Sequence, residues 1–209
     1  MDNSTHLLDG AALDAGAVGF DFDKGFPFVS GIQAPMYIDS RKLFFEPAIR
    51  EKTIEAFKKK IAELNLEFDV VAGVESGAIA PAALLASAIQ KKFVYVKKKP
   101  KEHGLKRMIE CGEVKGLKVL LVEDMVSTGG SSLNGVQALR DAGATVTDAV
   151  TIHKYDFPEP DKAFPEAKVV LHPLALVSDI AREAAKRGVI SQEQSEQIIN
   201  WLPQPHEHW

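Results

Sequence analysis

Cysteine is almost missing from this sequence of 209 residues, in which Cys111 is the only one. A single cysteine excludes an internal disulfide framework, so we expect a reducing compartment, the cytoplasm. No apolar run is long enough to span a bilayer, and the N-terminus lacks the basic start and apolar core of a secretory signal. The net charge of −4 gives no general case for binding nucleic acid. We therefore expect no membrane and no nucleic acid among the partners.

Two common nucleotide-binding fingerprints are missing as well. The sequence contains no Gly-x-x-x-x-Gly-Lys-Ser/Thr segment, and no Gly-x-Gly-x-x-Gly follows a predicted strand. What is present is an ordinary globular composition, with 45% apolar and 26% charged residues. The length suits a single domain over residues 1–209 that buries a full core.

Strand-like and helix-like stretches alternate from about residue 46 onward. This alternation predicts an α/β fold with a central parallel sheet flanked by helices. Residues 1–45 do not fit the alternation, and we expect them to form a small hood over the ligand edge of the sheet. The expected strands are Phe68–Ala72, Phe93–Val96, Val119–Val122, Val146–Ile152 and Lys168–Leu171, and the expected helices are Glu46–Leu64, Ala78–Gln90, Ser131–Ala142, Leu174–Lys186 and Ser191–Leu202.

The most informative segment begins with the apolar run Val119–Val122, which predicts a buried parallel strand. The acids Glu123 and Asp124 follow at the carboxyl end of that strand, where open α/β sheets bind ligands. A turn rich in hydroxyls and glycine then leads into a predicted helix, and a helix start of this kind is a phosphate site. Acids beside a phosphate site suit ribose hydroxyls or a divalent cation, so the pattern indicates a phosphorylated ribose. The turn consists of Ser127, Thr128, Gly129, Gly130 and Ser131.

This segment resembles the phosphoribosyl-diphosphate (PRPP) motif of the type I phosphoribosyltransferases. The resemblance implies that family's fold, with its N-terminal hood. It also implies that Glu123 and Asp124 bind the ribose hydroxyls, and that the turn, with Met125 and Val126 before it, holds the 5′-phosphate. It implies Mg²⁺ as cofactor, bound through PRPP, and we assign it no direct protein ligand. The competing interpretation is an ordinary strand–turn–helix corner with capping hydroxyls.

A basic loop follows the predicted strand Phe93–Val96. Its segment Lys101-Glu102-His103-Gly104 is similar to the loop of the orotate branch of that family. The resemblance implies that Lys97, Lys98, Lys101 and His103 bind PRPP, although the family usually has Arg where Lys97 stands. It also implies that Lys101, His103 and Asp124 act in catalysis, and that a homodimer shares this loop between subunits. A solvated loop, or an RNA-binding patch with strongly salt-dependent affinity, is the alternative.

The segment 30–41 resembles the part of the orotate branch that lies against the pyrimidine. The resemblance implies that Tyr37 stacks on the base, that Ser30 and Gly31 offer backbone groups to its edge, and that Ser127 also reaches it. Some relatives have Lys where Val29 stands, so that contact is not carried over. Taken alone, the segment favours a core strand with a buried tyrosine over a base-binding segment.

The segment Glu75-Ser76-Gly77 follows another predicted strand and precedes a helix. The resemblance implies that this loop receives pyrophosphate through backbone N–H groups. As a bare pattern it is weak, because many α/β proteins turn in this way.

Together these segments predict an enzyme that transfers phosphoribose from PRPP to orotate. Two alternatives stay open: a transferase for another base, such as a purine, and a regulator that senses PRPP without chemistry. At a further position some orotate enzymes have Arg, where this chain has Lys154-Tyr155.

Overall fold

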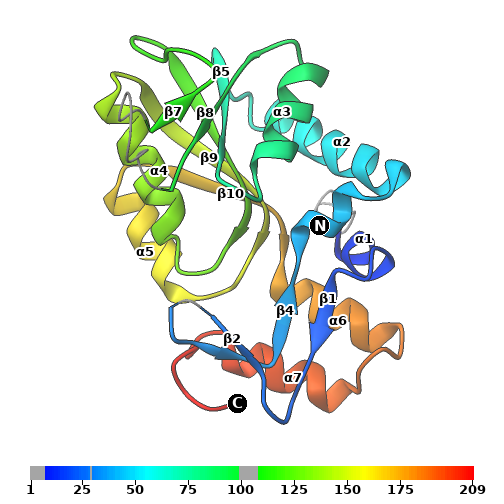
Figure 1. Ribbon diagram of the computed structural model, residues 1–209. Coiled ribbons are helices and arrows are strands. Elements are labelled where there is room, and N and C mark those ends of the chain that lie inside the picture. Colours follow the sequence, from blue (N-terminus) through cyan, green and yellow to red (C-terminus); the bar gives the residue numbers. More distant parts are fainter. Residues whose placement is uncertain (1–7, 29, 99–107) are drawn as a thin grey trace.

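The computed structural model describes residues 8–28, 30–98 and 108–209 (Figure 1). A six-stranded sheet forms its centre, in the order β10-β9-β8-β5-β6-β7. Neighbouring strands of this sheet run parallel, except that β7 is antiparallel to β6. The strands are β5 (Val70–Val74), β6 (Lys92–Val96), β7 (Ile109–Glu110), β8 (Lys118–Val126), β9 (Thr145–Lys154) and β10 (Val170–Leu176).

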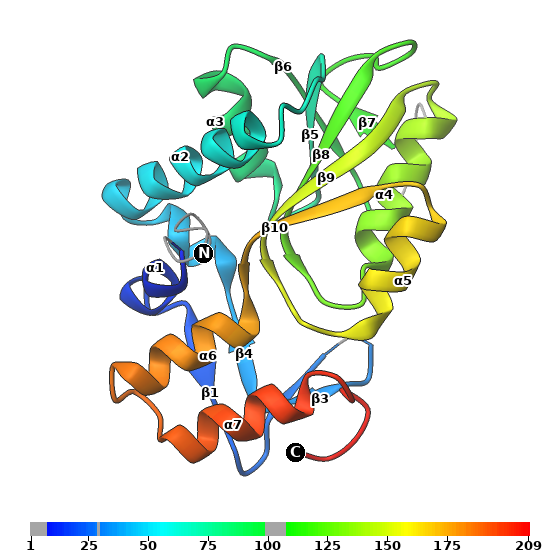
Figure 2. The ribbon, with the colours of Figure 1, turned by 180° about the vertical axis from the view of Figure 1, so that it is seen from behind.

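Helices cover both faces of this sheet because its strands are apolar on both sides. In β8, Leu120 and Val122 pack into one apolar core, while Val119 and Leu121 pack into a second core on the opposite face. Figures 1 and 2 show α2 and α3 on one side of the sheet and α4 and α5 on the other. These helices are α2 (Pro47–Glu63), α3 (Ile79–Ala88), α4 (Gly130–Asp141) and α5 (Pro158–Glu166).

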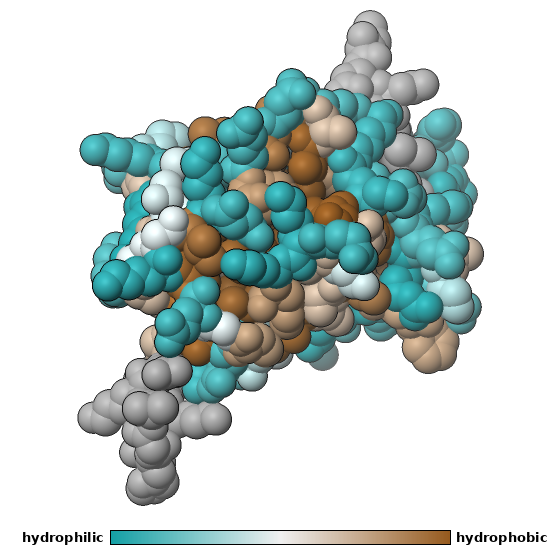
Figure 3. Space-filling view, turned by 90° about the horizontal axis from the view of Figure 1, so that it is seen from above, coloured by the Kyte–Doolittle hydropathy of each residue, from teal (hydrophilic) through white to brown (hydrophobic). Residues whose placement is uncertain are grey.

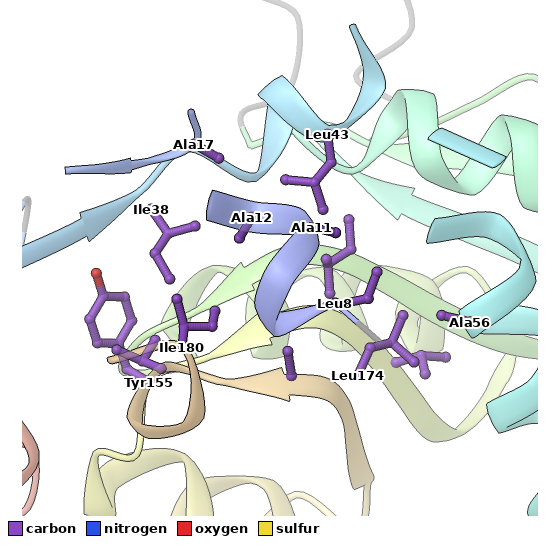
Figure 4. Close-up of a cluster of buried hydrophobic side chains, with 14 of the residues drawn as sticks. Leu8, Ala11, Ala12, Ala17, Ile38, Leu43, Ala56, Tyr155, Leu174 and Ile180 are labelled. Atoms are coloured by element: carbon purple, nitrogen blue, oxygen red, sulfur yellow. The ribbon is translucent and has the colours of Figure 1, made fainter. Parts of the chain in front are cut away.

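The described part of residues 8–45, which we call the hood, lies beyond the carboxyl ends of the parallel strands (Figure 1). It contains two small antiparallel sheets, β1 with β4 and β2 with β3. The hood packs through Leu8, Ile38 and Leu43 onto a core that includes Leu174 and Ile180 (Figure 4). Its elements are α1 (Asp9–Asp14), β1 (Val18–Phe20), β2 (Phe26–Pro27), β3 (Gln33–Ala34), β4 (Met36–Ile38) and the 3₁₀-helix η2 (Ser40–Phe44).

Two further helices, α6 (Val177–Lys186) and α7 (Gln192–Trp201), lie beside the hood (Figure 2). The expected cap of α7 is present. The Ser191 hydroxyl accepts a hydrogen bond from the backbone N–H of Gln194, and the Gln194 side-chain oxygen accepts one from the backbone N–H of Ser191. Seen from the end opposite the hood, the surface mixes hydrophilic side chains with apolar ones (Figure 3). In the part of the chain that is described, no helix combines the length and the apolar character needed to cross a bilayer.

The expected alternation is confirmed, and several elements differ from the expectation. The short antiparallel strand β7 was not expected. Strand β8 extends through Val126 rather than ending at Val122, because β9 continues to pair with it. Residues 174–176 belong to β10 rather than to a helix, because they pair with the end of β9. Helix α5 was not expected, since its three prolines are signals of chain breaks; two of them occupy its first turn, where proline is tolerated.

Candidate active site

Glu123 and Asp124 lie near the carboxyl end of β8, at the edge of the sheet that faces the hood. The Glu123 side chain is buried and only 4% exposed. Its Oε1 accepts a hydrogen bond from Ser132 Oγ at 2.9 Å and a longer one from Ser131 Oγ at 3.4 Å. Both serines belong to the first turn of α4, so the helix that follows the strand holds this acid in place.

The surroundings of these acids favour their protonated forms. Burial raises the pKa of Glu123 to about 8, and the neighbouring charge of Asp124 adds to the shift. Burial also raises the pKa of Asp124, while Arg41 and Lys98 act in the opposite direction. At neutral pH without ligand, the Glu123 carboxyl therefore carries a proton.

The turn after β8 offers backbone donors at the start of α4. Gly129 caps this helix with φ +85°, a left-handed conformation that glycine adopts without strain. A Cβ at this position would also lie 2.8 Å from the ring of Phe164 on α5, so this ring packs directly against the turn. The first N–H groups of a helix have no partner within it and attract anions. The local geometry is therefore that of a phosphate site.

A cavity of about 730 Å³ opens in front of this turn, between the turn and the hood. Lys98, just after β6, is the one cationic residue among the described residues that line it. The β8–α4 corner contributes Met125, Val126, Ser127, Thr128, Gly129, Gly130, Ser131 and Ser132, and the opposite side contributes Pro27, Phe28, Ser30, Tyr37, Ile38 and Tyr155.

Three aromatic rings form the wall of the cavity opposite the phosphate turn. Phe28 stands edge-on to Tyr37 and to Tyr155, with ring centroids 6.4 and 5.2 Å apart. The Tyr155 hydroxyl donates to the Met36 carbonyl at 2.9 Å, which ties β9 to the hood. Tyr37 is 39% exposed, so its face is open to a ligand. A flat, apolar ligand fits such a wall by stacking.

The loop between β5 and α3 lies against the acid pair. A Cβ at Gly77 would overlap the carboxylate of Asp124, so any side chain at this position must displace that carboxylate or the loop. The peptide bond between Glu75 and Ser76 is cis. Glu75 does not face the cavity with a free carboxylate, because its Oε2 accepts from the backbone N–H of Lys98 at 2.9 Å.

The family follows from comparison with known proteins. The phosphoribosyl transferase domain model matches residues 42–195. An orotate phosphoribosyltransferase of Bacteroides fragilis is 37% identical to this chain, over 100% of the chain and 98% of its own length. The chain belongs to the orotate phosphoribosyltransferases. The resemblance seen in the sequence and the expected fold class are thereby confirmed.

Solved structures of this fold agree with the architecture. The UMP synthase of Leishmania donovani superposes with a TM-score of 0.79 and 25% identity, over 96% of this chain and 42% of that one. The orotate phosphoribosyltransferase of Aeropyrum pernix has a TM-score of 0.74 and 24% identity, over 88% of this chain and 99% of that one.

Most of the site residues predicted from the sequence lie close together in the structure, but not all of them do. Ser30, Tyr37 and Lys98 line one cavity with the phosphate turn. Gly31 lies on the other side of the hairpin, in a hollow lined by residues 205–209. Lys101 and His103, like Val29, fall outside the described residues.

Lys97 has a different neighbour from the one expected. Its side chain is 8% exposed, and its ammonium lies 2.8 Å from the Glu110 carboxylate on β7. The Lys97 backbone N–H also donates to the Met108 carbonyl. These contacts place Lys97 at the base of the basic loop, where it joins β6 to β7. That it binds PRPP stays a prediction.

Phe28 and Ser132 belong to the site although the sequence did not indicate either of them. Phe28 was one of several phenylalanines in the hood, and nothing in that pattern distinguishes the one that faces the cavity. Ser132 stands one residue after the turn, and its bond to Glu123 was not expected. Lys154, where some orotate enzymes have Arg, pairs with Asp161 of α5 at 2.9 Å instead of lining the cavity.

Among the described residues, no group of three or more His, Cys, Asp or Glu could hold a metal ion. Glu123 and Asp124 are nevertheless two adjacent carboxyl groups at the phosphate turn. Mg²⁺ is commonly bound by one or two carboxylates together with substrate phosphates. The residues present therefore fit Mg²⁺ that arrives with a phosphorylated substrate.

Proposed function

We propose that this chain transfers the 5-phosphoribosyl group from PRPP to orotate, which yields orotidine 5′-phosphate and pyrophosphate, a step of pyrimidine biosynthesis. One observation carries the proposal. A phosphate turn and a wall of aromatic rings face each other across a single cavity of about 730 Å³, and the paired acids Glu123 and Asp124 lie on the strand that leads into this turn. Membership in the orotate phosphoribosyltransferases names the two substrates that such a cavity would hold side by side.

We assign separate groups of site residues to PRPP and to orotate. The turn Ser127–Ser131 and the start of α4 bind the 5′-phosphate through N–H groups and hydroxyls. Glu123 and Asp124 accept from the ribose hydroxyls and orient the sugar. Tyr37 stacks on the orotate, Ser30 and Ser127 bind its polar edge, and Glu75, Ser76 and Gly77 form the loop for pyrophosphate.

In the reaction, the bond between ribose C1 and the pyrophosphate oxygen breaks while the orotate nitrogen forms a bond to C1. Negative charge grows on the departing pyrophosphate, and positive charge grows on the ribose ring. Lys98, Lys101 and His103 stabilise the leaving group electrostatically, and we assign to His103 the donation of a proton or hydrogen bond to it. Asp124 stabilises the ring cation. Mg²⁺, when bound with PRPP, screens the phosphate charges.

Two further assignments belong to this proposal. We expect a homodimer that shares the basic loop between subunits. We also place the protein in the cytoplasm, because Cys111 is an exposed free thiol and thiols stay reduced there.

An absorbance assay tests the proposed function. PRPP and Mg²⁺ are supplied with orotate, uracil, adenine or hypoxanthine in separate reactions, and loss of each base is followed. We expect consumption of orotate alone, with release of pyrophosphate. Consumption of a purine but not of orotate would overturn the substrate assignment, and PRPP binding without turnover of any base would indicate a PRPP sensor.

A further inference from the structure

A continuous series of ring contacts joins the aromatic wall of the cavity to the last residues of the chain. Consecutive ring centroids in the series lie 5.2, 4.9, 5.4 and 6.2 Å apart. These are the separations at which aromatic pairs attract each other through their edges and faces. The series, which we call the aromatic column, consists in spatial order of Phe28, Tyr155, Phe157, Trp201 and Trp209.

The middle of the column is rigid. Tyr155 and Phe157 are almost completely buried, and Trp201 on α7 is 4% exposed. Tyr155 is fixed further by its hydrogen bond to the Met36 carbonyl. The buried end of the column therefore offers a firm surface on which another ring can rest.

Trp209 rests on this surface and also holds the hood. Its indole stands edge-on to Trp201, and its Nε1–H donates to the Phe22 carbonyl at 3.3 Å. A Cβ at Gly25 would overlap the same indole ring, so the backbone before β2 lies directly against it. Gly25 has φ +68°, which glycine allows at this close contact.

The segment that carries Trp209 also has a contact outside the hood. After α7 the chain turns back toward β2 and β3, as Figure 2 shows. Pro205 is buried, and the His206 ring lies 3.1 Å from the Glu159 carboxylate of α5. The indole thus connects α7 and the segment after it to the hairpin of β2 and β3, whose connecting loop carries Phe28 and Ser30 on the cavity wall.

We propose that Trp209 is a positioning residue for the base half of the active site. It touches no substrate, and it acts by holding the β2–β3 hairpin so that Phe28 and Tyr37 form the stacking wall. The inference rests on the proposed function, because it takes orotate as the base. The sugar-phosphate half is built from β8 and α4 and contains no ring of the aromatic column. Binding of a sugar phosphate there should therefore not depend on Trp209.

Binding of two product fragments tests this separation. Orotidine 5′-phosphate contacts both halves of the cavity, whereas ribose 5-phosphate contacts only the turn and the acids. In Trp209→Ala we expect about tenfold weaker binding of orotidine 5′-phosphate in calorimetry, since a ring contact and its packing are lost. Binding of ribose 5-phosphate should stay within about twofold of the wild type. The KM for orotate should rise with little change in kcat.

Three further variants complete the test. Trp209→Phe keeps a ring against Gly25 and should restore most of the affinity, and Glu207→Ala, an exposed neighbour, should match the wild type. If Trp209→Ala does not melt cooperatively, the same comparison is made with Trp209→Leu. Equal weakening of both ligands, or of neither, would overturn the inference. A wild type that consumes no orotate and binds no orotidine 5′-phosphate would instead overturn the proposed function.

Discussion

At the scale of single residues, Glu123 is an acid of the candidate site whose chemistry departs strongly from its ordinary behaviour in solution. It is buried beneath the phosphate turn with two serine hydroxyls and a second acid beside it. A carboxyl that is neutral at neutral pH repels an incoming phosphate less than a carboxylate would. Hydrogen bonds from ribose hydroxyls favour the charged form, so they lower the pKa again once the sugar is bound. With Glu123 bound to the ribose as we propose, the burial of this acid links sugar binding to loss of a proton.

This link predicts a pH dependence of PRPP binding. The free protein has a Glu123 pKa of about 8. Below that pH the proton must leave on binding, so affinity should rise with pH by up to about tenfold per unit and level off above pH 8. Calorimetry in two buffers with different heats of ionisation measures the released proton directly.

The phosphates of PRPP also titrate, so the comparison needs a matched variant. Glu123→Gln keeps the shape and the hydrogen bonds but cannot titrate, and its pH profile gives the contribution of the ligand alone. Glu113→Gln, at an exposed position, should behave as the wild type. Identical pH profiles for the wild type and Glu123→Gln would show that Glu123 does not exchange a proton on binding.

At the scale of the elements, the loop between β5 and α3 and the strand β8 depend on each other. Gly77 lies so close to the Asp124 carboxylate that a methyl group there must displace one of them. In Gly77→Ala we expect kcat/KM for PRPP to fall by about a hundredfold, because small misplacements of catalytic groups cost that much. Steady-state kinetics at saturating orotate measures the loss.

The control for this variant is another glycine-to-alanine change in the same domain. Gly112 has only Val94 Cγ1 near a new Cβ, at 3.7 Å, an ordinary contact. Gly112→Ala should keep its activity, and both variants should melt cooperatively. Full activity in Gly77→Ala would mean that this loop does not set the position of Asp124.

The elements also show what the sequence could predict. The geometry of the β8–α4 corner was predictable because it is local: a buried strand, two acids and a capped turn follow one another within 119–131. Its binding of the sugar phosphate stays a prediction. Helix α7 was predictable from its capping box. The end of β10 was not predictable, since pairing with β9 overrode the helical pattern of residues 174–176. Helix α5 was not predictable either, because Pro165 lies inside it.

At the scale of the whole molecule, the base half of the cavity shows why the remaining parts could not be predicted. Phe28, Tyr155 and Trp209 are far apart in the sequence, and only the packing of hood, sheet and α7 brings their rings into one column. No local pattern distinguishes these rings from core aromatics. The two halves of the site therefore differ in how they arise, one from a continuous segment and one from tertiary contacts.

The proposed sharing of the basic loop is a property of the assembled dimer, and mixed subunits test it. Lys101→Ala removes the loop cation, and Asp124→Asn removes the charge beside the ribose, so each homodimer should be almost inactive. If the loop crosses to the partner, a heterodimer of the two variants has one site with both defects and one with neither. Mixing should then restore up to about half the wild-type activity per heterodimer.

Two differently tagged subunits allow the heterodimer to be isolated by successive affinity steps before its activity is measured. A mixture of Lys101→Ala with Lys101→Ala carrying the second tag controls for the exchange procedure and should stay inactive. An isolated heterodimer without activity would place each loop in its own subunit's site. The cavity of one chain would then supply every catalytic group, because Lys98, Asp124 and the phosphate turn already belong to that chain.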